Sequence, residues 1–263
     1  MWIELDGLVN LRDVGGIPTT DGSEIHPGRL LRSDNLQSLT SDDIDKLLQL
    51  GLTDVIDLRS DFEAENEGPG PMTEVEAVHI HHHSLFREWR EGVGEDKPDE
   101  RPEVVPEEAL PWVDLAPSVQ IEHPLASHYL SYLSDRPDSV VASLREIANA
   151  EGATLVHCAA GKDRTGTIVA MALMVAGAEP EAVVADYAAS GERMQQIVDR
   201  LLDTATYNEN LKDRPLSSHM TYPETMQAFL DHVQAEYGSM EKLLETMGWT
   251  EADTKQLRAK LRD

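Results

Sequence analysis

The sequence predicts an α/β fold with a central, mostly parallel sheet flanked by helices. Two observations support this prediction. Short apolar β-type runs alternate with segments whose apolar residues recur at helical spacing, and parallel strands need helical connections of this kind. In addition, 40% of the 263 residues are hydrophobic, which is enough to build a sizeable core. We expect one domain over 1–263, with a lid-like insertion over 86–124.

The first part of the chain contains the runs that favour strands: 8–14, 29–32, 53–58 and 75–80. Gly15, Gly16 and Pro18 follow the first of these runs and indicate a turn. A helix is predicted over 41–50. It begins after Thr40, with aspartates in its first turn, and it ends before Gly51.

The second part is predicted to be helical apart from one buried strand over 153–157. The expected helices cover 127–134, 139–150, 164–176, 181–189, 191–202, and three segments of 223–261 that Gly238 and Gly248 separate. Between the two parts, 86–124 carries six prolines among many acidic residues. Apart from a short helix around 86–92, we expect little regular structure there, and long loops of this kind often form lids.

The charge of the chain limits the partners that it can have. Lys and Arg total 22 against 49 Asp and Glu, a formal net charge of −27. Such a surface repels nucleic acid and anionic membranes, so we expect neither as a stable partner. The longest apolar run, 168–176, is too short to cross a bilayer, and no signal-like segment opens the chain. We therefore expect a cytoplasmic monomer, although export by a route without a signal peptide stays open.

The segment that carries the chemistry is Val156–Gly166, VHCAAGKDRTG, between the buried strand and a helix. It contains Cys158, the one cysteine of the chain, so no internal disulfide can form. Arg164 follows after five intervening residues. A loop that enters a helix N-terminus can turn its N–H groups toward a tetrahedral anion, and Gly161 permits the backbone conformation that this requires.

This arrangement predicts a phosphate-binding loop with a nucleophile beneath the anion. The N–H groups and the helix dipole favour the thiolate form of Cys158, and Arg164 can hold two phosphate oxygens with its planar fork. The hydroxyl of Thr165 can donate to the sulfur. The predicted phosphate-binding residues are Ala159, Ala160, Gly161, Lys162, Asp163, Arg164 and Thr165.

Two other loop types fit the segment less well. An ATP-binding Walker loop needs Ser or Thr directly after the lysine and a glycine five residues before the second glycine, where this chain has Asp163 and Val156. A rhodanese-type sulfur transferase loop lacks the Lys-Asp-Arg-Thr-Gly ending.

HCAAGKDRTG resembles the signature loop of the protein tyrosine phosphatase superfamily. Its Lys-Asp-Arg variant is similar to a bacterial group of tyrosine and dual-specificity phosphatases of the mycobacterial B type. Further matching stretches are 10–16 (NLRDVGG), 28–36 (GRLLRSDNL), 39–60 and the tail from Tyr222. The resemblance implies the fold of that superfamily, no cofactor, and activity on phosphotyrosine or phosphoserine proteins or on phosphoinositides.

Two residues are candidates for the general acid. The Trp-Pro-Asp sequence that carries the acid in well-known tyrosine phosphatases is absent. The segment 111–114 (PWVD) is only partly similar to it. Asp163 lies within the loop, as does the aspartate of the related myotubularin lipid phosphatases, and we favour it. Asp57 ends a predicted strand and is the second candidate, with an ion pair to Arg59 or Arg164 as its structural alternative.

Several basic residues and histidines have structural and functional interpretations. Lys162 is expected to add positive charge at the rim of the pocket. One or more of Arg12, Arg29, Arg32 and Arg59 can hold the loop or form structural ion pairs, and His157 is expected to fix the loop by hydrogen bonding. Alternation places His79, His81 and His83 on one face of a strand. The mechanism needs no metal, so we expect these histidines to line the site entrance or the junction with the insertion.

The sequence therefore predicts a phosphomonoester hydrolase in which Cys158 attacks phosphorus and forms a phosphocysteine. Arg164 holds the phosphoryl oxygens, and Asp163 or Asp57 protonates the leaving oxygen. The alternative from another class is a phosphate-binding pseudophosphatase without turnover. A metal-binding histidine protein is a third interpretation.

Overall fold

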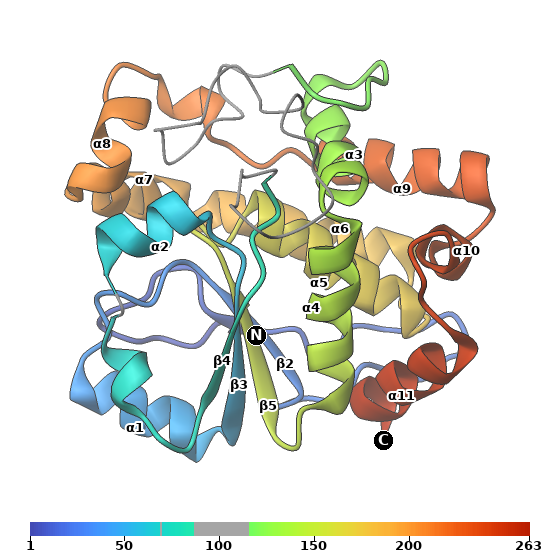
Figure 1. Cartoon of the computed structure of the whole chain (residues 1–263), viewed down its shortest axis with the longest axis horizontal. Coiled ribbons are helices and arrows are strands. Elements are labelled where there is room, and N and C mark those ends of the chain that lie inside the picture. Colours follow the sequence, from blue (N-terminus) through green and yellow to red (C-terminus); the bar gives the residue numbers. More distant parts are fainter. Residues whose placement is uncertain (69, 87–115) are drawn as a thin grey trace, which may run out of the picture.

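The computed structural model describes residues 1–68, 70–86 and 116–263. It has a five-stranded sheet of order β1-β2-β5-β3-β4, shown almost edge-on in Figure 1. The strands are β1 (Arg12–Asp13), β2 (Leu30–Ser33), β3 (Leu52–Asp57), β4 (His79–His82) and β5 (Ala153–His157). β1 pairs antiparallel with β2, and the other pairs are parallel. The predicted α/β class with a mostly parallel sheet is confirmed.

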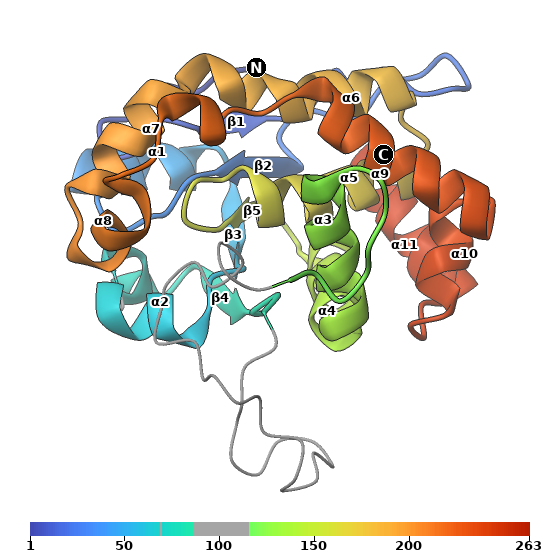
Figure 2. The same cartoon turned by 90° about the horizontal axis from the view of Figure 1, so that it is seen from above.

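Helices cover both faces of this sheet (Figures 1 and 2). α1 (Ser41–Gln49) packs on one face, where its apolar residues join those of β2, β3 and β5 in a common core. α4 (Pro137–Asn149) and α5 (Asp163–Val175) pack on the other face, together with α11 (Glu251–Arg262). β5 lies between β2 and β3, and all five of its residues are buried. This explains why its sequence, ATLVH, is mostly apolar and does not alternate with exposed polar residues.

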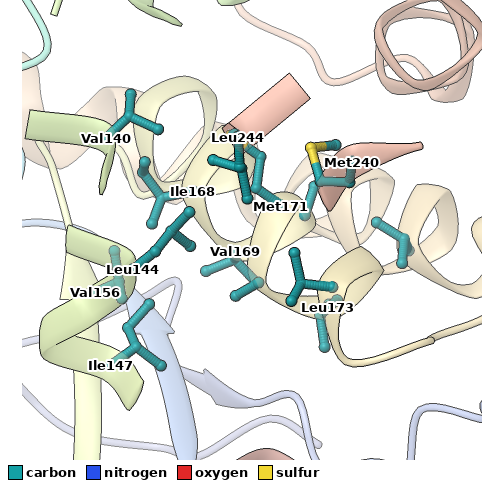
Figure 3. Close-up of a cluster of buried hydrophobic side chains, with 14 of the residues drawn as sticks. Val140, Leu144, Ile147, Val156, Ile168, Val169, Met171, Leu173, Met240 and Leu244 are labelled. Carbon is teal, nitrogen blue, oxygen red and sulfur yellow. The ribbon is translucent and has the colours of Figure 1, made fainter. Parts of the chain in front are cut away.

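α5 is the central helix of the larger core. Almost all of its residues are buried, which is typical of a helix surrounded on every side. Figure 3 shows Ile168, Val169 and Met171 packed among side chains of α4, β5 and α10 (Met240–Glu245). Because α5 begins directly after the loop of Cys158, this core fixes the position of the loop.

The remaining helices complete the two layers. They are α2 (Asp61–Glu67), α3 (Pro124–Asp135), α6 (Pro180–Ala189), α7 (Met194–Leu202), α8 (Ala205–Leu211) and α9 (Pro223–Tyr237), with 3-10 turns at Pro71–Glu74, Ser190–Arg193 and Leu216–Ser218. None of the helices in the described ranges is long and apolar enough to cross a membrane.

Most elements were predicted within a few residues, including α1 with its Thr40 cap and the break of the tail at Gly238 and Gly248. The helix α2 was missed, although Ser60 and Glu63 form a capping box that the sequence displays. α8 was missed as well. The short helix expected around 86–92 lies almost entirely outside the described residues, as does most of the 86–124 insertion. The described part, 116–123, has no helix or strand.

Two strand predictions were wrong in extent. Regular pairing at the first edge covers only Arg12–Asp13 rather than 8–14, because the preceding backbone bonds to side chains: Val9 and Asn10 donate to Asp34. β4 starts at His79 rather than at 75, since its pairing with β3 begins there, while Val75 and Val78 reach the core from a turn.

Candidate active site

The site lies at the carboxyl edge of the parallel strands. Ser33 and Asp57 both stand opposite His157 in the sheet register, so β2, β3 and β5 end side by side. Cys158 follows β5 directly and is buried. Open parallel sheets bind ligands at this edge, where the loops between strands and helices converge.

The loop after Cys158 has its carbonyl groups turned outward. The carbonyl of Ala159 accepts from the backbone N–H of Asn35 (3.0 Å), that of Ala160 from the Asn10 side chain (2.8 Å), and that of Gly161 from Nη2 of Arg32 (2.9 Å). A planar trans peptide sends the next N–H in the direction opposite to its carbonyl. Consecutive outward carbonyls therefore leave a row of N–H groups that faces inward, a geometry that can bind an anion.

Two buried arginines brace this loop from the N-terminal segments. Arg32 contacts Oδ2 of Asp186 on α6 at 2.5 Å, and Arg12 contacts Oδ1 of the same carboxylate at 2.9 Å. Arg12 also donates to the side chain of Asn10 at 2.7 Å. The motifs NLRDVGG and GRLLRSDNL thus place their polar side chains behind the loop, where they fix its backbone. Arg59 pairs with Asp57 instead.

Gly161 has the left-handed conformation that the sequence led us to expect, with φ of 67°. A Cβ at this position would lie 2.3 Å from the carbonyl oxygen of Ser33. Both the backbone angle and the lack of space therefore require glycine here. α5 then begins at Asp163, and its N-cap residue Lys162 makes no side-chain capping bond. The first N–H groups of α5 have no cap from Lys162 that competes with an anion.

Arg164 is held so that one edge of its guanidinium is left for a ligand. Of its five N–H donors, three are occupied: two go to Glu63 (2.5 and 2.9 Å) and one to the carbonyl of Leu58 (3.3 Å). The two others, on Nε and Nη2, lie on the same edge of the plane. Such a pair matches two oxygens of a phosphate.

Glu63 and Phe86 fix the charge and the plane of Arg164. Burial alone would lower the pKa of Arg164, but the carboxylate of Glu63 outweighs it and the pKa lies well above its usual value. The guanidinium also lies over the ring of Phe86, 4.7 Å from its centroid. Arg164 therefore stays charged and oriented in a buried site.

Asp163 lines the pocket and has a defined partner. Tyr129 on α3 donates to its Oδ1 at 2.5 Å, and the Tyr129 hydroxyl is 2.7 Å from that of Tyr187 on α6. Burial, followed by the charge of Asp163, raises the pKa of Tyr129 well above its usual value, so this phenol stays protonated and acts as the donor. The carboxyl of Asp163 is thus held at the pocket by two neighbouring helices.

Asp57 has a different environment from Asp163. Its Oδ1 accepts from Nε of Arg59 at 2.9 Å and its Oδ2 from Nη2 of Arg59 at 2.6 Å, and its Oδ1 lies 3.7 Å from Nε2 of His157. Burial opposes its charge, but His157 and Arg59 outweigh burial and hold the pKa of Asp57 well below its usual range. This is the ion pair that the sequence analysis gave as the structural alternative. Asp57 does not appear among the residues that line the pocket.

His157 and Thr165 support the loop in different ways. His157 is buried, its Nδ1 lies 3.3 Å from the carbonyl of Cys158, and burial lowers its pKa to about 4, so it is neutral at neutral pH. The hydroxyl of Thr165 is buried and has no hydrogen-bond partner in the described part of the chain. The expected bond from Thr165 to the sulfur is therefore not formed in this structure.

The pocket above Cys158 has a polar floor and an apolar wall. The floor includes Lys162, whose Nζ donates to the carbonyl of His219 at 2.8 Å. The wall comes from α7 and α8, and its residues are Met194, Ile197, Val198, Leu201 and Leu211. Their spacing along α7 follows one helical face. The pocket can thus receive an anion attached to an apolar group.

Several supporting residues were not found from the sequence: Asn10, Glu63, Tyr129, Asp186 and His219. Only Glu63 had a local signal, the capping box with Ser60. The others reach the loop from positions that are distant in sequence, and no local pattern indicates such contacts.

Comparison with known proteins adds to this geometry. The model of the tyrosine phosphatase family matches residues 3–263. The chain belongs to the tyrosine phosphatase family. It is accordingly an enzyme of the phosphoric monoester hydrolase class. The predicted resemblance to this superfamily, with its α/β fold, is confirmed.

Three curated relatives span much of the chain. A triple specificity protein phosphatase of Mycobacterium tuberculosis is 28% identical over 98% of this chain and 98% of its own. A tyrosine-protein phosphatase of Nostoc commune is 27% identical over 93% of this chain and 78% of its own. A putative tyrosine-protein phosphatase of Cupriavidus necator is 28% identical, over 74% of this chain and 64% of its own.

Proposed function

We propose that this phosphatase hydrolyses phosphomonoesters through a phosphocysteine, with Cys158 as nucleophile. The thiolate of Cys158 attacks phosphorus as the ester P–O bond breaks. The leaving oxygen takes a proton from Asp163. Water then attacks the phosphocysteine, the P–S bond breaks, and Asp163 takes a proton from that water. The loop residues Ala159 to Thr165 and Arg164 bind the phosphoryl oxygens throughout.

The observation that carries this proposal is the free edge of Arg164 beside an inward-facing row of N–H groups, in a pocket that contains Cys158. The donors are fixed before a substrate arrives, because Glu63, Asn10 and Arg32 hold them from outside. Preorganised donors stabilise the charge that develops on equatorial oxygens without reorganisation during the reaction.

Asp163 is the better candidate for the general acid. Its carboxyl lies on the pocket and accepts a hydrogen bond from Tyr129, with the ammonium group of Lys162 farther away at 3.5 Å. Asp57, in contrast, pairs closely with Arg59, at 2.6 Å. The general acid must be protonated in the first step. A strong ion pair stabilises the ionised carboxylate and so disfavours that protonated form. We therefore assign the acid and base role to Asp163 and keep Asp57 as the alternative.

The substrate class that we propose is phosphotyrosine protein first, with phosphoserine proteins and phosphoinositides as further substrates. The apolar face of α7 suits an aromatic ring attached to the phosphate. The name of the Mycobacterium tuberculosis relative indicates broad specificity, which supports the further substrates. Lys162 adds a positive charge for a second phosphate. We also propose that the chain acts as one cytoplasmic domain, as a monomer, without a metal or other cofactor in catalysis.

The test compares phosphate release by the wild type and by Cys158→Ser, with a chelator present. A phosphotyrosine peptide, a phosphoserine peptide and a soluble phosphoinositide serve as substrates. We expect turnover by the wild type that survives chelation, no turnover by the variant, and retained phosphate affinity in the variant. Acid quench of the wild type should trap one phosphoryl group on Cys158.

Two outcomes would overturn the proposal. Substantial turnover by Cys158→Ser would exclude the covalent route. A folded wild type that binds phosphate but releases none from any of the three substrates would favour the pseudophosphatase alternative.

A further inference from the structure

A second cluster of chemically active side chains lies away from the phosphate loop. The cluster contains one ligand atom from each of three residues, and these three atoms all lie within 4.8 Å of one another. The residues are His81, His83 and Glu146. His81 is on β4, His83 follows that strand, and Glu146 is on α4. Two imidazoles and a carboxylate on rigid elements form the ligand set of many zinc sites with an open fourth position.

The geometry around His81 is that of a metal ligand with an outer partner. Its Nε2 lies 2.9 Å from Oδ1 of Asp54, while its Nδ1 lies 3.5 Å from Oε1 of Glu146. Two ligands of a tetrahedral zinc ion stand roughly 3.4 Å apart, given bonds of about 2.1 Å. The pair of Nδ1 and Oε1 fits that edge. Asp54 would fix the tautomer by accepting the proton on Nε2, as carboxylates do beside zinc-bound histidines.

His83 provides the independent observation. Its Nε2 is buried and has no hydrogen-bond partner in the described ranges of the chain. A buried nitrogen without a partner is costly, and a metal ion would satisfy it. The rings of His81 and His83 are nearly parallel, with an interplanar angle of 15° and centroids 6.4 Å apart, so the two imidazoles stand side by side.

We propose that His81, His83 and Glu146 bind one zinc-type divalent cation, with Asp54 as the outer partner of His81. The charges of Glu146 and Asp54 balance the two positive charges of the ion. This site is distinct from the catalytic pocket, and none of its residues lines that pocket. Because His83 lies three residues before Phe86, which contacts Arg164, an ion here would anchor the segment that reaches the phosphate clamp.

The test measures metal binding directly in the full-length chain. Cys158→Ser is the host, because the free thiolate would otherwise compete for the ion. Zn²⁺ affinity is measured by titration against a competing chelator, and Co²⁺ is used as a spectroscopic probe of coordination. We expect about one ion per chain, with the strong d–d absorption of a four-coordinate site.

Added singly to the host, His81→Ala, His83→Ala and Glu146→Gln should each weaken Zn²⁺ binding by more than about tenfold. His79→Ala is the matched control, since His79 is exposed on the same strand and outside the cluster, and it should leave the affinity unchanged. Glu146→Gln lies on a helix surface and tests the site even where a histidine variant does not fold.

The proposal is overturned if the host binds no Zn²⁺ at a defined stoichiometry. It is equally overturned if Glu146→Gln and the folded histidine variants keep the affinity of the host, which would place the ion elsewhere.

Discussion

At the scale of single residues, the assignment of the general acid rests on the contrast between two aspartates. Asp163 is positioned by a neutral phenol at the pocket, and Asp57 is held as a carboxylate by Arg59. Asp163→Asn removes the proton donor, so hydrolysis of a phosphoserine peptide should fall about 10²–10⁴-fold in kcat. An aryl phosphate with a good leaving group needs less protonation, and its hydrolysis should fall less. Steady-state kinetics with both substrates provides the comparison.

Equal losses on both substrates would contradict this assignment, since they indicate damage to the loop rather than a missing proton. No loss on either substrate would move the role to Asp57. Circular dichroism of the variant shows whether the fold is retained.

Glu63 is the second decisive residue, because it compensates the buried charge of Arg164. Glu63→Gln leaves that charge without its partner, and breaking a buried pair from one side costs about 3–5 kcal/mol. We expect a lower free energy of unfolding by this order in urea titrations, together with a loss of kcat. The control is Glu65→Gln on the exposed side of α2, which should change neither quantity. A stability of Glu63→Gln equal to that of the control would show that Arg164 is compensated by other groups.

At the scale of elements, the strand, loop and helix around Cys158 depend on the close approach of Gly161 to β2. In Gly161→Ala, an alanine must adopt the left-handed backbone conformation, which costs about 1–2 kcal/mol. Its Cβ also clashes with the carbonyl oxygen of Ser33. The loop must shift, so kcat/KM should fall steeply. Gly248→Ala carries the same kind of backbone strain, at φ of 89°, but a Cβ there meets nothing within 4 Å.

Gly248→Ala should therefore lose a little thermal stability and keep its activity. Melting curves and kinetics of the two variants separate strain from the clash. If Gly161→Ala retains wild-type kcat/KM, the loop does not need the packing against β2 that we describe.

At the scale of the whole molecule, stability should fall as the solution is acidified. Burial lowers the pKa of His157 from 6.5 to about 4 in the folded chain. Between pH 4 and pH 6.5, His157 is therefore protonated in the unfolded chain and neutral in the folded chain. His157 makes its full contribution to the free energy of unfolding above pH 6.5. This contribution, on the order of 3 kcal/mol, is lost as the pH falls to about 4.

His157→Gln removes this contribution. The difference in free energy of unfolding between the variant and the wild type should narrow as the pH falls from 6.5 to 4. His83 titrates in both proteins, so its effect cancels in the difference. Asp57 loses His157 as a neighbour in the variant, but Arg59 still pairs with its carboxylate there. A difference that stays constant over this range would show that His157 does not titrate as described.

The α/β class, the order of most elements and the central motif were all predictable from the amino-acid sequence. These depend on local physics: β5 shows no polar/apolar alternation because it is buried on both faces, and the Thr40 and Ser60 caps satisfy nearby N–H groups. The spacing of Cys158 and Arg164 is local too, since only a four-residue loop and the first residue of α5 separate them. These features could be read without knowing which distant segments meet.

The residues that surround this motif come together only in the folded chain. Glu63 clamps Arg164 across 101 residues, Asn10 bonds the loop across 150, and Tyr129 reaches Asp163 across 34. The same holds for Glu146, which meets His81 only because α4 packs on the face of the sheet against β3, the neighbour of β4. Such contacts arise when the sheet and its helices bring remote side chains together, and their energies depend on burial. No spacing along the chain records them, so the motif was predictable and its electrostatic environment was not.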